Sequence, residues 1–183
     1  MQNSEKIVRI QRMPFDQLPA DEKNLFKEAL KARNNAQAPY SNYHVGVALL
    51  SDKGTIHVGC NVERCTYTQT THAEQNAIDS MIATIGPSKI EKIAVIGALK
   101  EVKISLTEHS TMAISNVTCG HCLQIIWENC CNDASVKILN LEGNGIVAIA
   151  TIDDLLPFRF GPENLNIFYQ EPHFKDKAES ICL

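Results

Sequence analysis

The sequence lacks the long apolar run that a membrane span or a secretory signal requires. Its longest apolar stretches, residues 93–99 and 145–152, have the length of a β-strand and are too short to cross a bilayer. Residues 1–10 mix acidic and basic side chains without an apolar centre, which argues against a secretory signal. We therefore expect a cytoplasmic protein with no membrane partner.

An excess of positive charge is also missing. The 183 residues include 17 Lys and Arg against 21 Asp and Glu, a formal net charge of −4, and the lysines are spread along the chain. A nucleic-acid partner usually requires a basic stripe, so none is expected. There is no internal repeat or low-complexity segment, and the hydrophobic content of 44% with 21% charged residues is typical of one globular domain with a buried core.

The seven cysteines cannot all pair within one chain because their number is odd. In a reducing compartment, a Cys-x-x-Cys motif more often binds metal or acts in redox chemistry than belongs to a disulfide framework. Cys119 and Cys122 form such a motif, which on its own fits a redox pair, a metal half-site or a chance occurrence. The remaining thiols are most simply structural or incidental: Cys60, Cys65, Cys130, Cys131 and Cys182.

Helices and strands are expected to alternate along the chain, which favours an α/β layered domain. Apolar residues recur at helical spacing in three stretches: residues 20–36, 73–85 and 119–129. Strand-like stretches, including one in which Ile56, Val58 and Cys60 alternate with more polar residues, cover residues 44–50, 55–61, 90–99, 136–141 and 146–150. Thr151 is a plausible N-cap for a short helix that ends before Pro157.

Three segments carry weaker patterns. Pro14 and Pro19 exclude a long helix in residues 1–20, which we treat as an N-terminal extension of a domain at 21–165. Residues 101–106 either extend the preceding strand or leave it, and residues 107–115 have loop composition. The tail, residues 166–183, is weakly patterned, and we expect part of it to be disordered.

A metal site is predicted where two helices begin. One imidazole, from His72, and two thiolates, from Cys119 and Cys122, are three of the four ligands of tetrahedral zinc, and an open fourth position is typical of catalytic sites. Glu74 follows His72 by two residues and can act beside that position as a general acid and base. His121 could close the site, but its place between the cysteines directs its side chain elsewhere. We predict one Zn²⁺ per subunit.

Five blocks of sequence, taken in order, resemble the cytidine deaminase family. The resemblance includes the His-x-Glu and Cys-x-x-Cys signature of zinc deaminases and spans residues 38–50, 59–63, 72–75, 119–124 and 155–162. It implies a three-layer α/β/α sandwich around a mixed five-stranded sheet. The implied activity is hydrolytic deamination of cytidine or 2′-deoxycytidine, a small nucleoside substrate, to the uracil nucleoside and ammonia.

The resemblance also implies roles for single residues. His72, Cys119 and Cys122 match the zinc ligands and Glu74 the proton shuttle, while Asn61 and Glu63 match a pair that binds the ribose 3′-hydroxyl. Without the resemblance, Asn61 is an ordinary turn residue and Glu63 a solvated charge.

Four further positions match groups around the base. Tyr43 stands where the family usually has a phenylalanine stacked near the base, and its hydroxyl needs a partner. The backbone amide of Ala73 is expected to meet the pyrimidine, and the carbonyl of Val117 to lie near the leaving ammonia. Phe160 matches a residue that reaches into a neighbouring subunit's active site, and the alternative is an ordinary core aromatic at a chain turn.

The chain departs from the family pattern in three places. Thr118 replaces the proline that precedes the first cysteine, which leaves the loop that carries Val117 freer and predicts reduced or altered activity. Leu123 replaces an arginine that offsets three thiolates in some members, and the His72 ligand makes that loss tolerable. Residues 100–117 form a longer connection than usual.

Other functions and assemblies remain open on the sequence. One alternative is a deaminase of a modified cytosine nucleoside, and another is a non-catalytic zinc module, which would not need Glu74, Asn61 or Glu63. Family members with a histidine ligand are often twice as long and dimeric, whereas short members usually form tetramers. This short chain is expected to be a homo-oligomer, a tetramer in preference to a dimer.

Overall fold

The fold is built on one mixed sheet of six strands, seen in a computed structural model that describes residues 3, 5–107 and 117–165. The strand order is β1-β6-β5-β4-β2-β3. Among the neighbouring strands, β4 and β5 are parallel and the other pairs antiparallel. The strands are β1 (Gln11–Pro14), β2 (Tyr43–Ser51), β3 (Ile56–Cys60), β4 (Ile90–Leu99), β5 (Lys137–Leu141) and β6 (Ile146–Thr151). The five strands predicted from the sequence are confirmed.

The sixth strand comes from the N-terminal segment. β1 pairs antiparallel with β6, with Gln11 opposite Ile149, and therefore extends the sheet beyond the five strands that the resemblance implied. Phe15 and Leu18, which follow β1, are 5% and 3% exposed and pack in the core. The short strand has no clear alternation, and Pro14 is tolerated in it because β1 is an edge strand.

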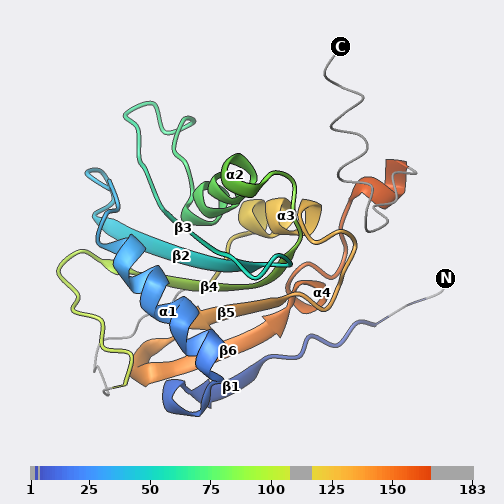
Figure 1. Ribbon diagram of the computed structural model, residues 1–183, viewed down its shortest axis with the longest axis horizontal. Helices are drawn as coiled ribbons and strands as arrows, with labels where there is room; N and C mark the ends of the chain where they lie inside the picture. Colours follow the sequence, from blue (N-terminus) through green and yellow to red (C-terminus); the bar gives the residue numbers. More distant parts are fainter. Residues whose placement is uncertain (1–2, 4, 108–116, 166–183) are drawn as a thin grey trace.

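Helices cover both faces of the sheet and make three layers (Figure 1). α1 (Ala20–Arg33) packs on one face through a cluster that includes Phe26, Ala94 and Leu139. α2 (Ala73–Ile85) and α3 (Gly120–Glu128), with the short α4 (Ile152–Leu155), pack on the other face. The α/β/α sandwich is therefore confirmed. No helix among the described residues has the length and apolar character that a bilayer span needs.

Two glycines set how closely the helices approach the sheet. A Cβ at Gly46 of β2 would lie 2.1 Å from the carbonyl oxygen of Ala29 in α1, and one at Gly59 of β3 would lie 2.3 Å from the amide nitrogen of Ala77 in α2. Larger residues would push both helices away. The covered face of β3 is consequently the one that carries His57 and Gly59, and Val58 on the other face is 41% exposed.

The ends of α1 and β4 differ from the sequence prediction. α1 stops at Arg33, whose buried guanidinium donates hydrogen bonds to the carbonyl oxygens of His44, Ala98 and Leu99. β4 ends at Leu99 in a turn, so the extension of this strand through residues 101–106 is wrong. The N-cap at Thr151 is confirmed by a capping box with Asp154. Residues 108–116, most of the predicted loop, and the tail at 166–183 lie outside the described residues.

Candidate active site

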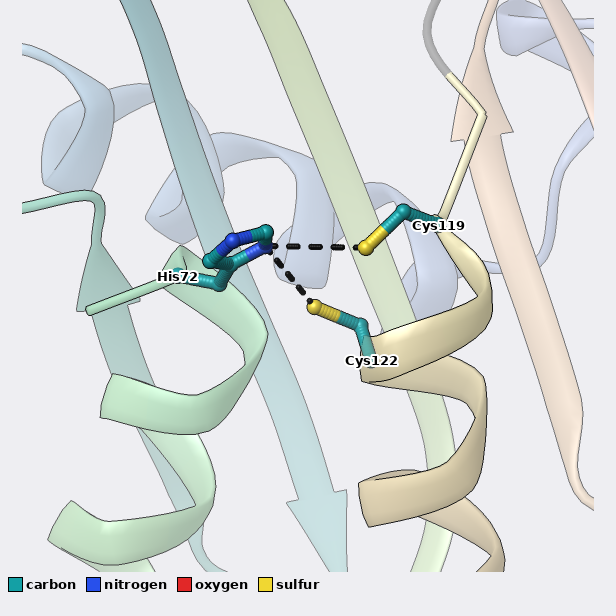
Figure 2. Close-up of side chains that lie close together, drawn as sticks. All are labelled: His72, Cys119 and Cys122. Atoms are coloured by element: carbon teal, nitrogen blue, oxygen red, sulfur yellow. Dashed lines mark hydrogen bonds between the residues drawn. The ribbon is translucent and has the colours of Figure 1, made fainter. Parts of the chain in front are cut away.

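The candidate site lies where α2 and α3 begin, on the same face of the sheet. His72 directly precedes α2 and Cys119 directly precedes α3, both with extended backbone (φ −73°, ψ 153° and φ −75°, ψ 161°). Figure 2 shows the His72 ring and the thiols of Cys119 and Cys122 pointing toward one another from these two helix starts. The positive end of a helix dipole favours thiolates, so the start of α3 suits Cys119 and Cys122 as thiolate ligands.

The three side chains have the spacing of zinc ligands. His72 Nδ1 lies 3.3 Å from Cys122 Sγ and 3.6 Å from Cys119 Sγ. Ligand bonds of about 2.0–2.1 Å to nitrogen and 2.3 Å to sulfur at a tetrahedral angle put these atoms about 3.6 Å apart. Within the described part of the chain, the donor atoms that all lie within 4.8 Å of one another come from these three residues. The donor set fits one tetrahedral zinc with a free fourth position.

Burial and nearby charge disfavour the thiolate form of Cys122. Cys122 is 0% exposed, and burial raises the pKa of its thiol, with further increases from the neighbouring Glu74 carboxylate and Cys119. Glu74 itself is 5% exposed. A bound divalent cation has the opposite effect and favours the deprotonated thiol. Cys119 is exposed, so the site opens to solvent on that side.

His121 does not belong to the donor group. It lies on the first turn of α3 with its side chain exposed, and its ring centroid is 5.2 Å from that of His72, with the planes inclined at 58°. The expectation that the position of His121 between the cysteines directs it away from the ligand set is therefore confirmed.

Asn61 holds the end of β3 against the start of β2. Its side-chain Oδ1 accepts a hydrogen bond from the Val45 amide at 2.8 Å, and its Nδ2 donates one to the Tyr43 carbonyl oxygen at 2.9 Å. An asparagine amide has two N–H donors and two acceptor positions, so one of each remains. Asn61 thus closes a strand, and its second N–H donates to no other residue in the described part of the chain.

Glu63 is tied to the turn that precedes β2. Its carboxylate accepts hydrogen bonds from the Tyr40 amide at 2.8 Å and from the amide and hydroxyl of Ser41. Burial alone would raise the pKa of the Glu63 carboxyl, but these hydrogen bonds outweigh it and lower the pKa. Tyr43, two residues beyond Ser41, is half-buried, and burial raises the pKa of its phenol. Glu63 is thus a fixed negative charge near the start of β2.

The remaining predicted residues, Ala73, Val117 and Phe160, differ widely in their exposure. Ala73 is 1% exposed in the first turn of α2, next to His72. Val117, just before the Cys119 ligand, is 70% exposed. Phe160 is 59% exposed, and its carbonyl oxygen accepts a hydrogen bond from Gln124 of α3 at 2.9 Å. Its ring is not a core aromatic.

A model of the cytidine and deoxycytidylate deaminase zinc-binding region matches residues 19–137. The chain belongs to this deaminase family. The matching region is a zinc-binding one, in agreement with the spacing of the three donor atoms. His72, Cys119 and Cys122 are therefore the group that can hold one zinc ion in this deaminase.

Similar proteins support this family membership, and the matches cover most of their length. A cytidine deaminase of Sporosarcina psychrophila is 35% identical over 146 residues, which are 80% of this chain and 96% of that protein. One from Halalkalibacterium halodurans is 33% identical over 146 residues and 98% of its length. The crystal structure of cytidine deaminase from Mycobacterium leprae matches with a TM-score of 0.60 and 28% identity, over 76% of this chain and all of that one.

One contact in the deaminase site was not predicted from the sequence. The hydroxyl of Thr118, which stands in the place of the family's proline, donates a hydrogen bond to Oδ1 of Asn140 at 3.1 Å. The available signal was a polar residue within the strand predicted at 136–141, where the neighbouring side chains are apolar. The hydrogen bonds from the 40–41 turn to Glu63 were missed as well, since no sequence pattern pairs these segments.

Proposed function

We propose that this deaminase hydrolyses cytidine and 2′-deoxycytidine to uridine and 2′-deoxyuridine, with release of ammonia. The observation that carries the proposal is the buried Glu74 beside three donors that fit one open zinc site. A structural zinc site has four protein ligands and needs no adjacent carboxylate. The names of the relatives, all cytidine deaminases, support the substrate class.

Glu74 carries the proton transfers in this proposal. Zinc, when bound, supplies a water whose pKa is lowered to about 7. Glu74 takes a proton from the attacking water and delivers it to N3 of the base as the bond to C4 forms. It then takes the proton of the new C4 hydroxyl and passes it to the exocyclic nitrogen, so that the C4–N bond breaks, ammonia leaves and the C4 carbonyl forms. The carboxylate is buried and cannot swing freely into solvent, so it stays oriented toward the reacting atoms.

The nucleoside lies between the zinc site and the start of β2. The second N–H of Asn61 and the carboxylate of Glu63 bind the ribose 3′-hydroxyl, and the ring of Tyr43 packs near the base. The Ala73 amide and the Val117 carbonyl contact the pyrimidine and the leaving ammonia. Asn61 is already fixed by two hydrogen bonds and Glu63 by three, so little ordering is required on binding.

A substrate panel tests the nucleoside assignment. We expect cytidine and 2′-deoxycytidine to react, and cytosine, cytidine monophosphate and a cytosine-containing oligonucleotide to react more slowly by about 10²-fold or more. The bare base leaves the hydroxyl-binding pair unfilled, and the Glu63 charge repels a phosphate. The loss of cytosine absorbance measures each rate. Equal rates for cytosine and cytidine would remove the ribose-binding role, and a modified cytosine nucleoside that reacts much faster would redefine the substrate.

The deaminase acts as a homo-oligomer in this proposal, a tetramer in preference to a dimer. Phe158 is 100% exposed and Phe160 59% exposed on the segment after α4, and adjacent exposed aromatics are typical of an interaction surface. Light scattering should give a mass well above the 20.3 kDa of one chain. Phe160→Ala should lower activity more than Leu165→Ala, a control at a side chain 60% exposed. A fully active monomer at micromolar concentration would contradict the proposal.

A further inference from the structure

We propose that Asn140 is a positioning residue, which holds the Cys119 ligand and the Val117 carbonyl in place through its hydrogen bond to Thr118. This bond restrains the segment at residue 118, as a proline at this position does in the family's pattern. The inference rests on the proposed function for its catalytic consequence, because the Val117 carbonyl matters only in a deaminase. The placement of Cys119 matters for zinc retention whatever the substrate is.

The contact has a rigid anchor. Thr118 is 3% exposed and Asn140 6% exposed, and the Thr118 hydroxyl donates to the Asn140 side chain at 3.1 Å. Asn140 lies on β5 with strands on both sides, in register with Val95 of β4 and Ala148 of β6. Its backbone therefore cannot shift without breaking the sheet, and a buried hydrogen bond to it fixes the Thr118 side chain.

The segment before α3 has few other restraints. Val117 is 70% exposed, and neither Val117 nor Thr118 forms a backbone hydrogen bond to another described residue. A cavity of about 80 Å³ is lined by Val117 and Asn140, together with Glu142 and Ala150. Close packing is therefore absent beside Val117, and among the described residues the Thr118–Asn140 bond is the hydrogen bond that ties the segment to the sheet.

A proline would restrain the same segment by a different means. Proline fixes its own φ near −65° and restricts the residue before it to extended conformations. Threonine has neither effect, so residue 118 needs an outside partner to reach the same order. The Thr118 amide donates no hydrogen bond to a described residue, so a proline there would forfeit none to these residues. The two solutions are interchangeable, and this equivalence can be tested.

The decisive comparison measures Asn140→Leu in two backgrounds. In the natural chain, we expect zinc release to a chelator to become about tenfold faster and kcat for cytidine to fall about tenfold, because a buried hydrogen bond is lost and its partner left unsatisfied. In the Thr118→Pro background, the same substitution should change either quantity by less than about twofold, because the backbone no longer depends on Asn140.

Companion variants guard against misfolding. Thr118→Val removes the hydroxyl at constant shape and should reproduce the effect of Asn140→Leu on zinc release and kcat. The double variant with both substitutions should change these quantities no more than either single one. Thr118→Ser keeps a hydroxyl and should retain the hydrogen bond. Ser51→Ala is the matched control. It removes a buried hydroxyl at the C-terminal end of β2, where Ser51 is hydrogen-bonded to Thr55 at 2.8 Å. This variant should lower the melting temperature without changing zinc release.

The outcomes separate this inference from the proposed function. Equal costs of Asn140→Leu in both backgrounds would show that Asn140 acts directly on the site, and unchanged zinc release in both Asn140→Leu and Thr118→Val would overturn the positioning role. If the natural chain does not deaminate cytidine but zinc release follows the expected pattern, the proposed function fails and the positioning role stands. If cytidine is deaminated but zinc release does not follow the expected pattern, the proposed function stands and the positioning role fails.

Discussion

Glu74→Gln lowers the deamination of cytidine by about 10²–10⁴-fold, the usual cost of losing a general acid and base, and leaves the zinc content unchanged. Glutamine keeps the size and much of the hydrogen bonding of the buried side chain, which is 5% exposed, but it cannot accept and return a proton. Steady-state kinetics and metal analysis of the same preparation measure the two effects.

Glu91→Gln is the control for this result, because it neutralises an exposed carboxylate on β4 and should leave kcat unchanged. If Glu74→Gln kept near-natural turnover, Glu74 would have no part in proton transfer. If it lost zinc as well as activity, Glu74 would hold the metal rather than move protons.

Cys122→Ala removes both zinc and activity. The thiol is fully buried and lies 3.3 Å from His72 Nδ1, so its loss leaves two protein ligands, a set too small for a stable zinc site. We expect zinc affinity to fall by more than about 100-fold, which exceeds the usual cost of losing a residue that only orients a ligand. Competition with a chromophoric chelator measures the affinity.

Cys130→Ala provides the matched control. It removes another fully buried thiol, one that follows α3 and donates a hydrogen bond to the Ile126 carbonyl oxygen at 3.0 Å. This variant should lose some stability and keep its zinc. Zinc retention by Cys122→Ala would mean that the metal binds elsewhere. Zinc loss by Cys130→Ala would mean that removing any buried thiol releases zinc, so that the loss in Cys122→Ala would not identify a ligand.

The parts of the site that the sequence predicted are local. His72 and Glu74 are two residues apart, Cys119 and Cys122 three, and each pair begins a helix with an apolar face. Short spacing and helix starts are visible in a sequence, so the grouping of the three donors could be predicted and is confirmed. The roles of Asn61 and Glu63 in substrate binding stay predictions.

The missed features depend on pairing between distant segments. β1 is a four-residue edge strand whose partner, β6, lies more than 130 residues away, and its own sequence has no strand pattern. Likewise, the Thr118–Asn140 bond joins positions 22 apart across a helix and a strand. A sequence shows that residue 118 departs from the proline pattern, but only the fold shows which side chain compensates.

Return of zinc to the metal-free protein tests the central claim most directly. Zinc is removed with a chelator, added back in known amounts, and cytidine deamination is measured at each step by absorbance. The account predicts that activity rises in proportion to bound zinc and stops at one zinc per chain, and that Glu74→Gln binds the same amount without gaining activity. Full deamination by the metal-free protein, or zinc binding with no deamination of any cytosine nucleoside by the natural chain, would contradict it.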